Sequence, residues 1–225
     1  WFFIVFHMCV IFPTVVMMYH FFFQAEDGIR DLVRSRGLGD GYKGQAMDSR
    51  AAAVSTTGKI SRELFEYRAG SGQGHERDFL TVGSMGHASQ IALGIALSQP
   101  DRNIYCFDGD GAVLMHMGAL AITGSMQPAN FYHILFNNGV HDSVGGQPTV
   151  GYKVDLPEVA AACGYKTVLS VDNADDLSDV LADLTDNDAP LFLEIKVKKG
   201  ARADLGRPTT TPVENKEALM DFLKR

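Results

Sequence analysis

Short apolar runs alternate with longer amphipathic or alanine-rich stretches from Met47 to the end of the chain. The apolar runs predict β-strands at residues 52–56, 78–82, 104–107, 132–136, 166–170 and 191–197. The stretches between them predict helices at residues 61–68, 88–98, 113–124, 156–163, 174–184 and 213–224. This alternation is typical of a doubly wound α/β domain, in which a mostly parallel sheet carries helices on both faces.

Residues 1–45 do not follow this alternation. Residues 1–23 are nearly all apolar and long enough for a membrane span, but no Lys or Arg precedes Arg30 and no cleavage site is evident. Residues 21–45 closely resemble the translation of a sequencing-library adaptor. We therefore interpret residues 1–45 as a non-native or disordered leader and residues 46–225 as one domain. A genuine membrane anchor at residues 1–23 is the alternative.

Two polar motifs each close an apolar strand. Gly109-Asp110-Gly111 follows the run at 104–107, and Asn137-Asn138 follows the run at 132–136, with 25 residues between the motifs. A Gly-Asp-Gly alone is ordinary turn chemistry, but the two motifs at this spacing form a more specific pattern. In a parallel sheet both would lie at the carboxyl edge, where α/β folds bind ligands.

The residue types of these motifs suit a divalent cation that carries a diphosphate. Asp110 offers a carboxylate, Asn138 an amide oxygen and Val140 a backbone carbonyl, and Mg²⁺ prefers such oxygen ligands. Gly109 and Gly111 allow backbone N–H groups to approach phosphate closely, and a helix that starts near Ala112 presents its positive end there. Two purely structural turns are the alternative.

This combination resembles the cofactor motif of thiamine-diphosphate enzymes. The wider resemblance covers about residues 55–225 and is to the phosphonopyruvate decarboxylases, followed by the sulfopyruvate decarboxylases. It rests on five segments: TTGK, TVGSMGHAS, DGDGAVLMHMGAL, NNGVHDSVGGQPT and DLGRPTTTPVENKEA. It implies thiamine diphosphate and Mg²⁺ as cofactors and the loss of carbon dioxide from 3-phosphonopyruvate to give phosphonoacetaldehyde. A sulfopyruvate decarboxylase subunit and a non-catalytic fragment are the alternatives.

The resemblance also assigns residues outside the two motifs. In the loop that contains Ser84, it implies that Met85 props the cofactor into a bent shape and that the carbonyl of Gly83 binds the amine of its aminopyrimidine. It places the turn Thr57-Gly58-Lys59 near the diphosphate, although a solvent-facing Lys59 is as plausible. Four residues after the metal-binding turn are expected to face the substrate: His141, Asp142, Ser143 and Gln147. Of these, His141 and Asp142 are the catalytic candidates, and a purely structural His141 stays open.

The composition limits which kinds of partner the protein binds. The net charge of −7 argues against nucleic acid as the main partner. The three cysteines, Cys9, Cys106 and Cys163, have no paired spacing, which favours free thiols and a cytoplasmic location. The resemblance implies a second, pyrimidine-binding domain, for which residues 45–55 leave no room. We therefore expect that domain or subunit to arrive in trans within a homo- or hetero-oligomer, and this chain to be largely inactive alone.

Overall fold

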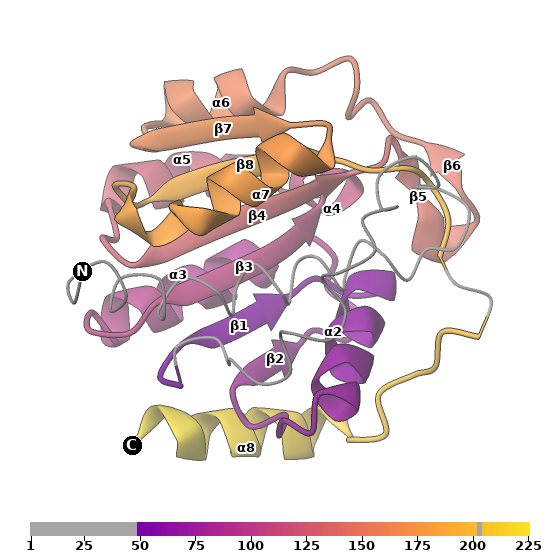
Figure 1. Cartoon of the computed structure of the whole chain (residues 1–225), viewed down its shortest axis with the longest axis vertical. Helices are drawn as coiled ribbons and strands as arrows, with labels where there is room; N and C mark the ends of the chain where they lie inside the picture. Colours follow the sequence, from indigo (N-terminus) through magenta and orange to yellow (C-terminus); the bar gives the residue numbers. More distant parts are fainter. Residues whose placement is uncertain (1–48, 202–203) are drawn as a thin grey trace, which may run out of the picture.

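The computed structural model describes residues 49–201 and 204–225, so the leader predicted at residues 1–45 and Cys9 lie outside the described part. The described chain folds around a six-stranded sheet in the order β2-β1-β3-β4-β8-β7, and every neighbouring pair is parallel (Figure 1). The strands are β1 (Ala52–Ser55), β2 (Asp78–Leu80), β3 (Ile104–Gly109), β4 (Phe131–Asn137), β7 (Thr167–Val171) and β8 (Leu191–Lys196). The predicted α/β class is confirmed.

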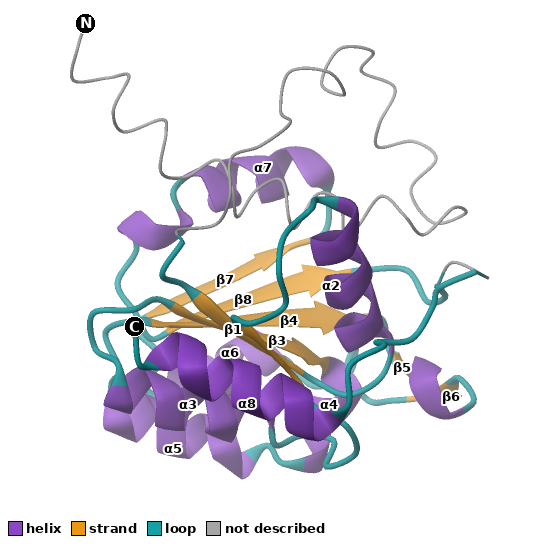
Figure 2. Ribbon diagram, turned by 90° about the horizontal axis from the view of Figure 1, so that it is seen from below, coloured by secondary structure: helices purple, strands orange, loops and turns teal. Residues whose placement is uncertain are grey.

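Helices cover both faces of this sheet (Figure 2). One face carries α2 (Lys59–Gly70) and α7 (Ala174–Ala182). The other face carries α3 (Ala88–Ser98), α5 (Gly118–Met126), α6 (Leu156–Cys163) and α8 (Pro212–Leu223). Each face has its own apolar core, and all seven residues of β4 are buried between the two. A parallel sheet covered on both sides has this burial, which is why its strands appear in the sequence as continuous apolar runs.

Small residues and caps position the helices. Ala88, Ala92 and Ala96 of α3 are at most 1% exposed, and they form part of the same core cluster as the sheet residues Ala52 and Ile104. The helices α6, α7 and α8 begin at side chains that accept a backbone N–H of the first turn, and α8 carries a full capping box. Their starts therefore follow from the sequence.

The edge strand β2 is covered by α8 (Figure 1). The side chain of Asn215 accepts a hydrogen bond from the N–H of Leu80 at 2.9 Å and donates one to the carbonyl of Asp78 at 2.7 Å. These bonds satisfy backbone groups that an exposed edge would leave open for pairing with another chain. Among helices of the described ranges, none combines the length and apolar content needed to cross a membrane.

Two predicted features differ from the structure. The single helix predicted at residues 113–124 is two helices, α4 (Asp110–Met115) and α5 (Gly118–Met126), because His116 has a non-helical backbone conformation. A short antiparallel hairpin, β5 (Val140–His141) and β6 (Gln147–Pro148), follows β4 around the 3₁₀ turn Asp142–Val144 and was not predicted. The other boundaries differ by a few residues, as is usual for helix and strand ends.

Candidate active site

The loops that follow β1, β2, β3 and β4 meet at the carboxyl edge of the sheet. Because these four strands are adjacent and parallel, their ends lie side by side. Figure 1 shows the start of α2, the helix α4 and the β5–β6 hairpin together at the arrowhead ends of the strands. Every candidate residue named from the sequence lies on one of these loops, on the hairpin or at the adjoining helix starts.

Asp110 is the first residue of α4 and is 1% exposed. Its carboxylate accepts a hydrogen bond from the hydroxyl of Thr149 and further bonds from the backbone N–H groups of Asn138 and Gly111. Burial raises the pKa of Asp110 above its ordinary value, although these hydrogen bonds act in the opposite direction. Asp110 and the turn at Asn138 are therefore in direct contact.

Asn138 belongs to a turn that returns the chain toward Val140. Its side-chain oxygen accepts the N–H of Val140 at 3.0 Å, and its side-chain nitrogen donates to Asp142 at 3.0 Å. A carboxamide oxygen has two lone pairs, so the oxygen of Asn138 keeps one for another partner. The turn at Asn138 therefore lies next to Asp110, whose carboxylate accepts its backbone N–H, and the side chain of Asn138 bonds to Val140 and Asp142.

Asn137, the first asparagine of the pair, has a structural role that the sequence did not reveal. It is fully buried, and its nitrogen donates to the carbonyl of Gly151 and to the carboxylate of Glu194, each at 2.8 Å. Glu194 on β8 also accepts the hydroxyl of Ser170 at 2.7 Å. Asn137 therefore joins the turn to Gly151 and to Glu194 of β8.

At Gly151 and at Gly111 the backbone lies very close to side chains of the candidate site. A Cβ atom on Gly151 would lie 2.5 Å from a carboxylate oxygen of Asp110 and 2.8 Å from the side-chain oxygen of Asn137. A Cβ atom on Gly111 would collide with the imidazole of His141. His141 therefore lies directly against the start of α4. A side chain at either position would force the neighbouring side chain to shift.

The turn Thr57-Gly58-Lys59 reaches the same cluster. Lys59 is the first residue of α2, and its ammonium group lies 3.5 Å from the carboxylate of Asp142. Asp142 also accepts Asn138 and the N–H of Gly200, which comes from the C-terminal segment. The side chain of Lys59 is 31% exposed, so Lys59 both reaches solvent and pairs with Asp142.

The turn also contacts Ser143 and the loop after β2. A Cβ atom on Gly58 would come within 2.8 Å of Ser143. The hydroxyl of Thr57 accepts the N–H of Gly83 at 3.3 Å, which joins the turn to the loop around Met85. The ends of β1, β2 and β4 are therefore linked by direct contacts.

The loop after β2 has an unusual backbone. Gly83, Ser84 and Gly86 all have positive φ values, of 70°, 46° and 89°, and this region is costly for a serine. Met85 between them is half-buried, and Gly86 packs against the carbonyl of Ala112. The loop is thus held in one shape against the first turn of α4.

Two candidates are more exposed. Gln147 lies opposite His141 in the β5–β6 hairpin and is exposed, as is Ser143. His87 and His116 face each other with ring centroids 4.2 Å apart, and both are exposed. These residues form the rim of the candidate site.

The residues present fit a Mg²⁺-bound diphosphate. Asp110, Asn138 and Val140 offer a carboxylate, an amide oxygen and a carbonyl, which is the oxygen set that magnesium prefers. Lys59 adds a positive charge at the same edge of the sheet.

Comparison with known proteins agrees with this chemistry. The family model described as "Thiamine pyrophosphate enzyme, C-terminal TPP binding domain" matches residues 56–195. A phosphonopyruvate decarboxylase of Streptomyces viridochromogenes is 47% identical over 164 residues, which are 73% of this chain and 40% of that protein. A sulfopyruvate decarboxylase subunit beta of Methanococcus maripaludis is 31% identical over 172 residues, which are 76% of this chain and 89% of that subunit.

A solved structure shows the same fold. The 2-oxoglutarate:ferredoxin oxidoreductase of Magnetococcus marinus superposes with a TM-score of 0.55 over 69% of this chain and 57% of that one, at 13% sequence identity. The chain spans about two fifths of the length of the phosphonopyruvate decarboxylases that it matches. From the family match and the arrangement of the site, the chain belongs to the thiamine pyrophosphate enzymes, as their C-terminal TPP-binding domain.

Proposed function

We propose that the chain is the diphosphate-binding part of a decarboxylase that converts 3-phosphonopyruvate to phosphonoacetaldehyde and carbon dioxide. The observation that carries this proposal is the contact between Asp110 and the turn at Asn138, which are two of the three proposed metal ligands. Its substrate part rests on the similarity to phosphonopyruvate decarboxylases, at 47% and 43% identity.

The first role of these residues is to hold the cofactor. Asp110, Asn138 and the carbonyl of Val140 are proposed to bind Mg²⁺, and the backbone N–H groups around Gly111 to contact the diphosphate. Bound thiamine diphosphate supplies a thiazolium ring that accepts the electron pair left when carbon dioxide departs from a 2-oxo acid. The contacts of the Gly83 loop with Thr57 and with the start of α4 support its proposed role of holding the other end of the cofactor.

The second role is to bind and orient the substrate. His141 lies against the start of α4, so its imidazole is next to the proposed diphosphate position and can donate a hydrogen bond or move a proton there. Lys59 adds a positive charge that suits a phosphonate or a carboxylate, and its contact with Asp142 holds that charge at the site. Ser143 and Gln147, on the exposed part of the hairpin, are proposed to contact the distal group of the acid.

A partner is proposed to complete the site in trans. Several large apolar side chains near the site are exposed, and Val82, beside the Gly83 loop, is 71% exposed. Others lie on α4, on α5 and between the two helices: Met115, Met117, Ile122 and Met126. A surface of this kind is typical of a protein–protein interface. We propose that a pyrimidine-binding domain or subunit covers it within an oligomer.

The second candidate function is that of a sulfopyruvate decarboxylase subunit. It is favoured by the length of its relatives, because the described domain covers 89% of the subunit from Methanococcus maripaludis. The two acids share the 2-oxo acid group and differ in the distal anion, so the same cofactor site serves both.

The test combines this chain with the N-terminal part of the Streptomyces viridochromogenes decarboxylase, as a fusion and as separate chains. Carbon dioxide release is measured with 3-phosphonopyruvate, sulfopyruvate and pyruvate, each with thiamine diphosphate and Mg²⁺. Preference for 3-phosphonopyruvate supports the proposal, and preference for sulfopyruvate favours the second candidate. A fusion that binds the cofactor and releases carbon dioxide from neither acid would overturn both.

A further inference from the structure

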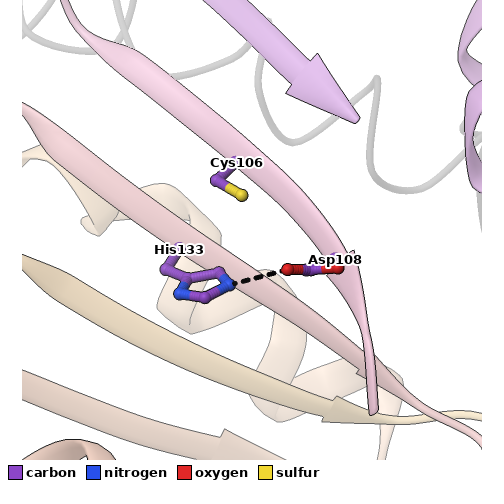
Figure 3. Close-up of side chains that lie close together, drawn as sticks. All are labelled: Cys106, Asp108 and His133. Atoms are coloured by element: carbon purple, nitrogen blue, oxygen red, sulfur yellow. Dashed lines mark ion pairs between the residues drawn. The ribbon is translucent and has the colours of Figure 1, made fainter. Parts of the chain in front are cut away.

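Three side chains with metal-binding atoms meet inside the sheet, away from the candidate active site. Cys106 and Asp108 belong to β3, and His133 belongs to β4 (Figure 3). The register pairs Cys106 directly with His133, and Asp108, two residues further along β3, points to the same face. That face is the one covered by α3, α5 and α6, and all three residues are buried there.

The three ligand atoms converge. The sulfur of Cys106, an oxygen of Asp108 and a nitrogen of His133 all lie within 4.8 Å of one another. The Nε2 atom of His133 lies 3.5 Å from Oδ2 of Asp108, and neither atom has a hydrogen-bond partner, although both side chains are only 1% exposed. Buried polar atoms without a partner are costly and rare in native proteins.

The other polar atom of each side chain is already engaged. Nδ1 of His133 lies 3.1 Å from the hydroxyl of Tyr165, and Oδ1 of Asp108 accepts the N–H of Gly109 at 3.0 Å. A histidine that donates from Nδ1 presents a lone pair at Nε2. Metal-binding histidines and carboxylates are usually oriented by such contacts. The free atoms Nε2, Oδ2 and Sγ are thus left facing one another.

We propose that Cys106, Asp108 and His133 form a binding site for a zinc ion. A thiolate, a carboxylate and a neutral imidazole are all established zinc ligands, and their bond lengths of about 2.0–2.3 Å are reached from this arrangement by small side-chain movements. The two negative ligands neutralise a divalent cation, which a buried site requires. A sulfur ligand disfavours Mg²⁺, so this site is chemically distinct from the oxygen ligands around Asp110.

The competing explanation is an ion pair without metal, in which a protonated His133 faces the Asp108 carboxylate. In this ion pair, the sulfur of Cys106 makes no bond to either of the other two side chains. The two explanations differ in whether the sulfur becomes a ligand, and this difference can be measured.

The test measures metal content and sulfur ligation in the full chain. After expression with zinc and dialysis, elemental analysis is expected to find about one zinc per chain. Replacement by Co²⁺ is expected to give the near-ultraviolet charge-transfer band of a cobalt–thiolate bond. Cys106→Ala should abolish this band and lower the zinc content at least tenfold. Cys163→Ala, which removes a thiol on α6 outside the cluster, should change neither.

Two further measurements keep the test decisive. Asp110→Ala should retain the zinc and the band, because it changes only the oxygen ligands at the sheet edge. X-ray absorption on the wild-type zinc protein should show one sulfur among the ligands, which needs no variant of the core to fold. Fewer than one zinc in ten chains, only oxygen and nitrogen ligands, or loss of the zinc in Asp110→Ala would each overturn the proposal. None of these results depends on decarboxylase activity.

Discussion

The hydroxyl of Thr149 donates a hydrogen bond to the carboxylate of Asp110, although the two residues are 39 positions apart. The same hydroxyl accepts the N–H of Gly151 at 3.1 Å, and the N–H of Thr149 donates to the carbonyl of Gly139 at 2.8 Å. Thr149 therefore ties the segment after the β5–β6 hairpin to both motifs of the candidate site, and it orients the carboxylate of Asp110.

Replacing Thr149 by Val should weaken the Mg²⁺-dependent binding of thiamine diphosphate about tenfold. Removing a residue that orients a metal ligand lowers metal affinity by about 10–100-fold, and the expected effect is at the lower end of this range. The change keeps the shape of the side chain and deletes the hydroxyl. Calorimetric titration of the cofactor with and without Mg²⁺ measures the effect. Thr209→Val, at an exposed threonine, is the control and should bind as the wild type does. Equal affinities in both variants would remove Thr149 from the site.

Replacing Asp110 by Ala should abolish Mg²⁺-dependent cofactor binding. We expect the affinity for the cofactor in the presence of Mg²⁺ to fall at least about 100-fold. Removing a residue that only orients a metal ligand already lowers metal affinity by about 10–100-fold, and Asp110 is a proposed ligand itself. The same titration measures it, and Asp101→Ala, at an exposed aspartate of a turn, is the control. If Asp110→Ala still bound the cofactor only with Mg²⁺ and at the wild-type affinity, Asp110 would not be a metal ligand.

The two motifs could be predicted from the sequence because each directly follows an apolar strand. In a parallel sheet that position alone brings Asp110 and Asn138 to one edge. The partners Thr149 and Gly151 could not be predicted, because their contact with Asp110 depends on how the β5–β6 hairpin folds back. The distinct role of Asn137 could not be predicted either, since it requires Glu194 from a strand far along the chain.

The fold was predictable for a similar reason. Strands buried on both faces leave a strong apolar signal, and the caps at Asp155, Asn173 and Thr211 mark where helices begin. The break between α4 and α5 leaves no such signal, because the residues around His116 suit a continuous helix. The Cys106–Asp108–His133 cluster could not be predicted either, since only the register of β3 against β4 brings the three residues together.

Asp110 should make the stability of the cofactor-free protein depend on pH. Burial raises its pKa above the ordinary 3.8, so the folded state disfavours the charged carboxylate. Below pH 3.8 the group is protonated in both the folded and unfolded states and carries no penalty. As pH rises through the raised pKa, the folded state loses stability relative to the unfolded state.

Asp110→Asn, which stays neutral, should therefore gain stability over the wild type as pH rises from the ordinary pKa of 3.8 through the raised pKa of Asp110, and the gain should level off above it. Urea unfolding at several pH values measures the difference in the free energy of unfolding between the two proteins. Asp179→Asn, at an exposed aspartate of α7, should show a smaller pH-dependent difference. A difference between Asp110→Asn and the wild type that stays constant with pH would contradict the assigned environment.

Two glycine-to-alanine changes should differ in effect: Gly111→Ala should weaken cofactor binding, and Gly94→Ala should raise stability. Gly111→Ala places a methyl group against the imidazole of His141, so it should displace His141 and weaken cofactor binding. Gly94 lies inside α3 with no atom near its would-be Cβ, so Gly94→Ala should stabilise the chain by about 0.5–1 kcal/mol. Thermal unfolding and cofactor titration of both variants check this pair. Unchanged cofactor binding in Gly111→Ala would show that His141 is free to move away.

The buried ion pair between Arg68 and Asp78 should be the most sensitive electrostatic contact in the described fold. The guanidinium of α2 and the carboxylate of β2 form two hydrogen bonds, at 2.7 and 2.8 Å, and both side chains are fully buried. Asp78→Ala removes the carboxylate that pairs with the buried guanidinium of Arg68, and breaking a buried pair in this way costs about 3–5 kcal/mol. Urea unfolding of this variant measures the loss.

An exposed pair provides the comparison for this loss. Lys224 and Asp221 also lie 2.8 Å apart, but both are largely exposed, so Asp221→Ala should leave the unfolding midpoint almost unchanged. Removing both buried charges in Arg68→Met/Asp78→Leu should recover much of the stability lost in Asp78→Ala, because replacing a whole buried ion pair by apolar side chains is often neutral in stability. A double variant less stable than Asp78→Ala would instead show that the pair contributes net stability through its hydrogen bonds.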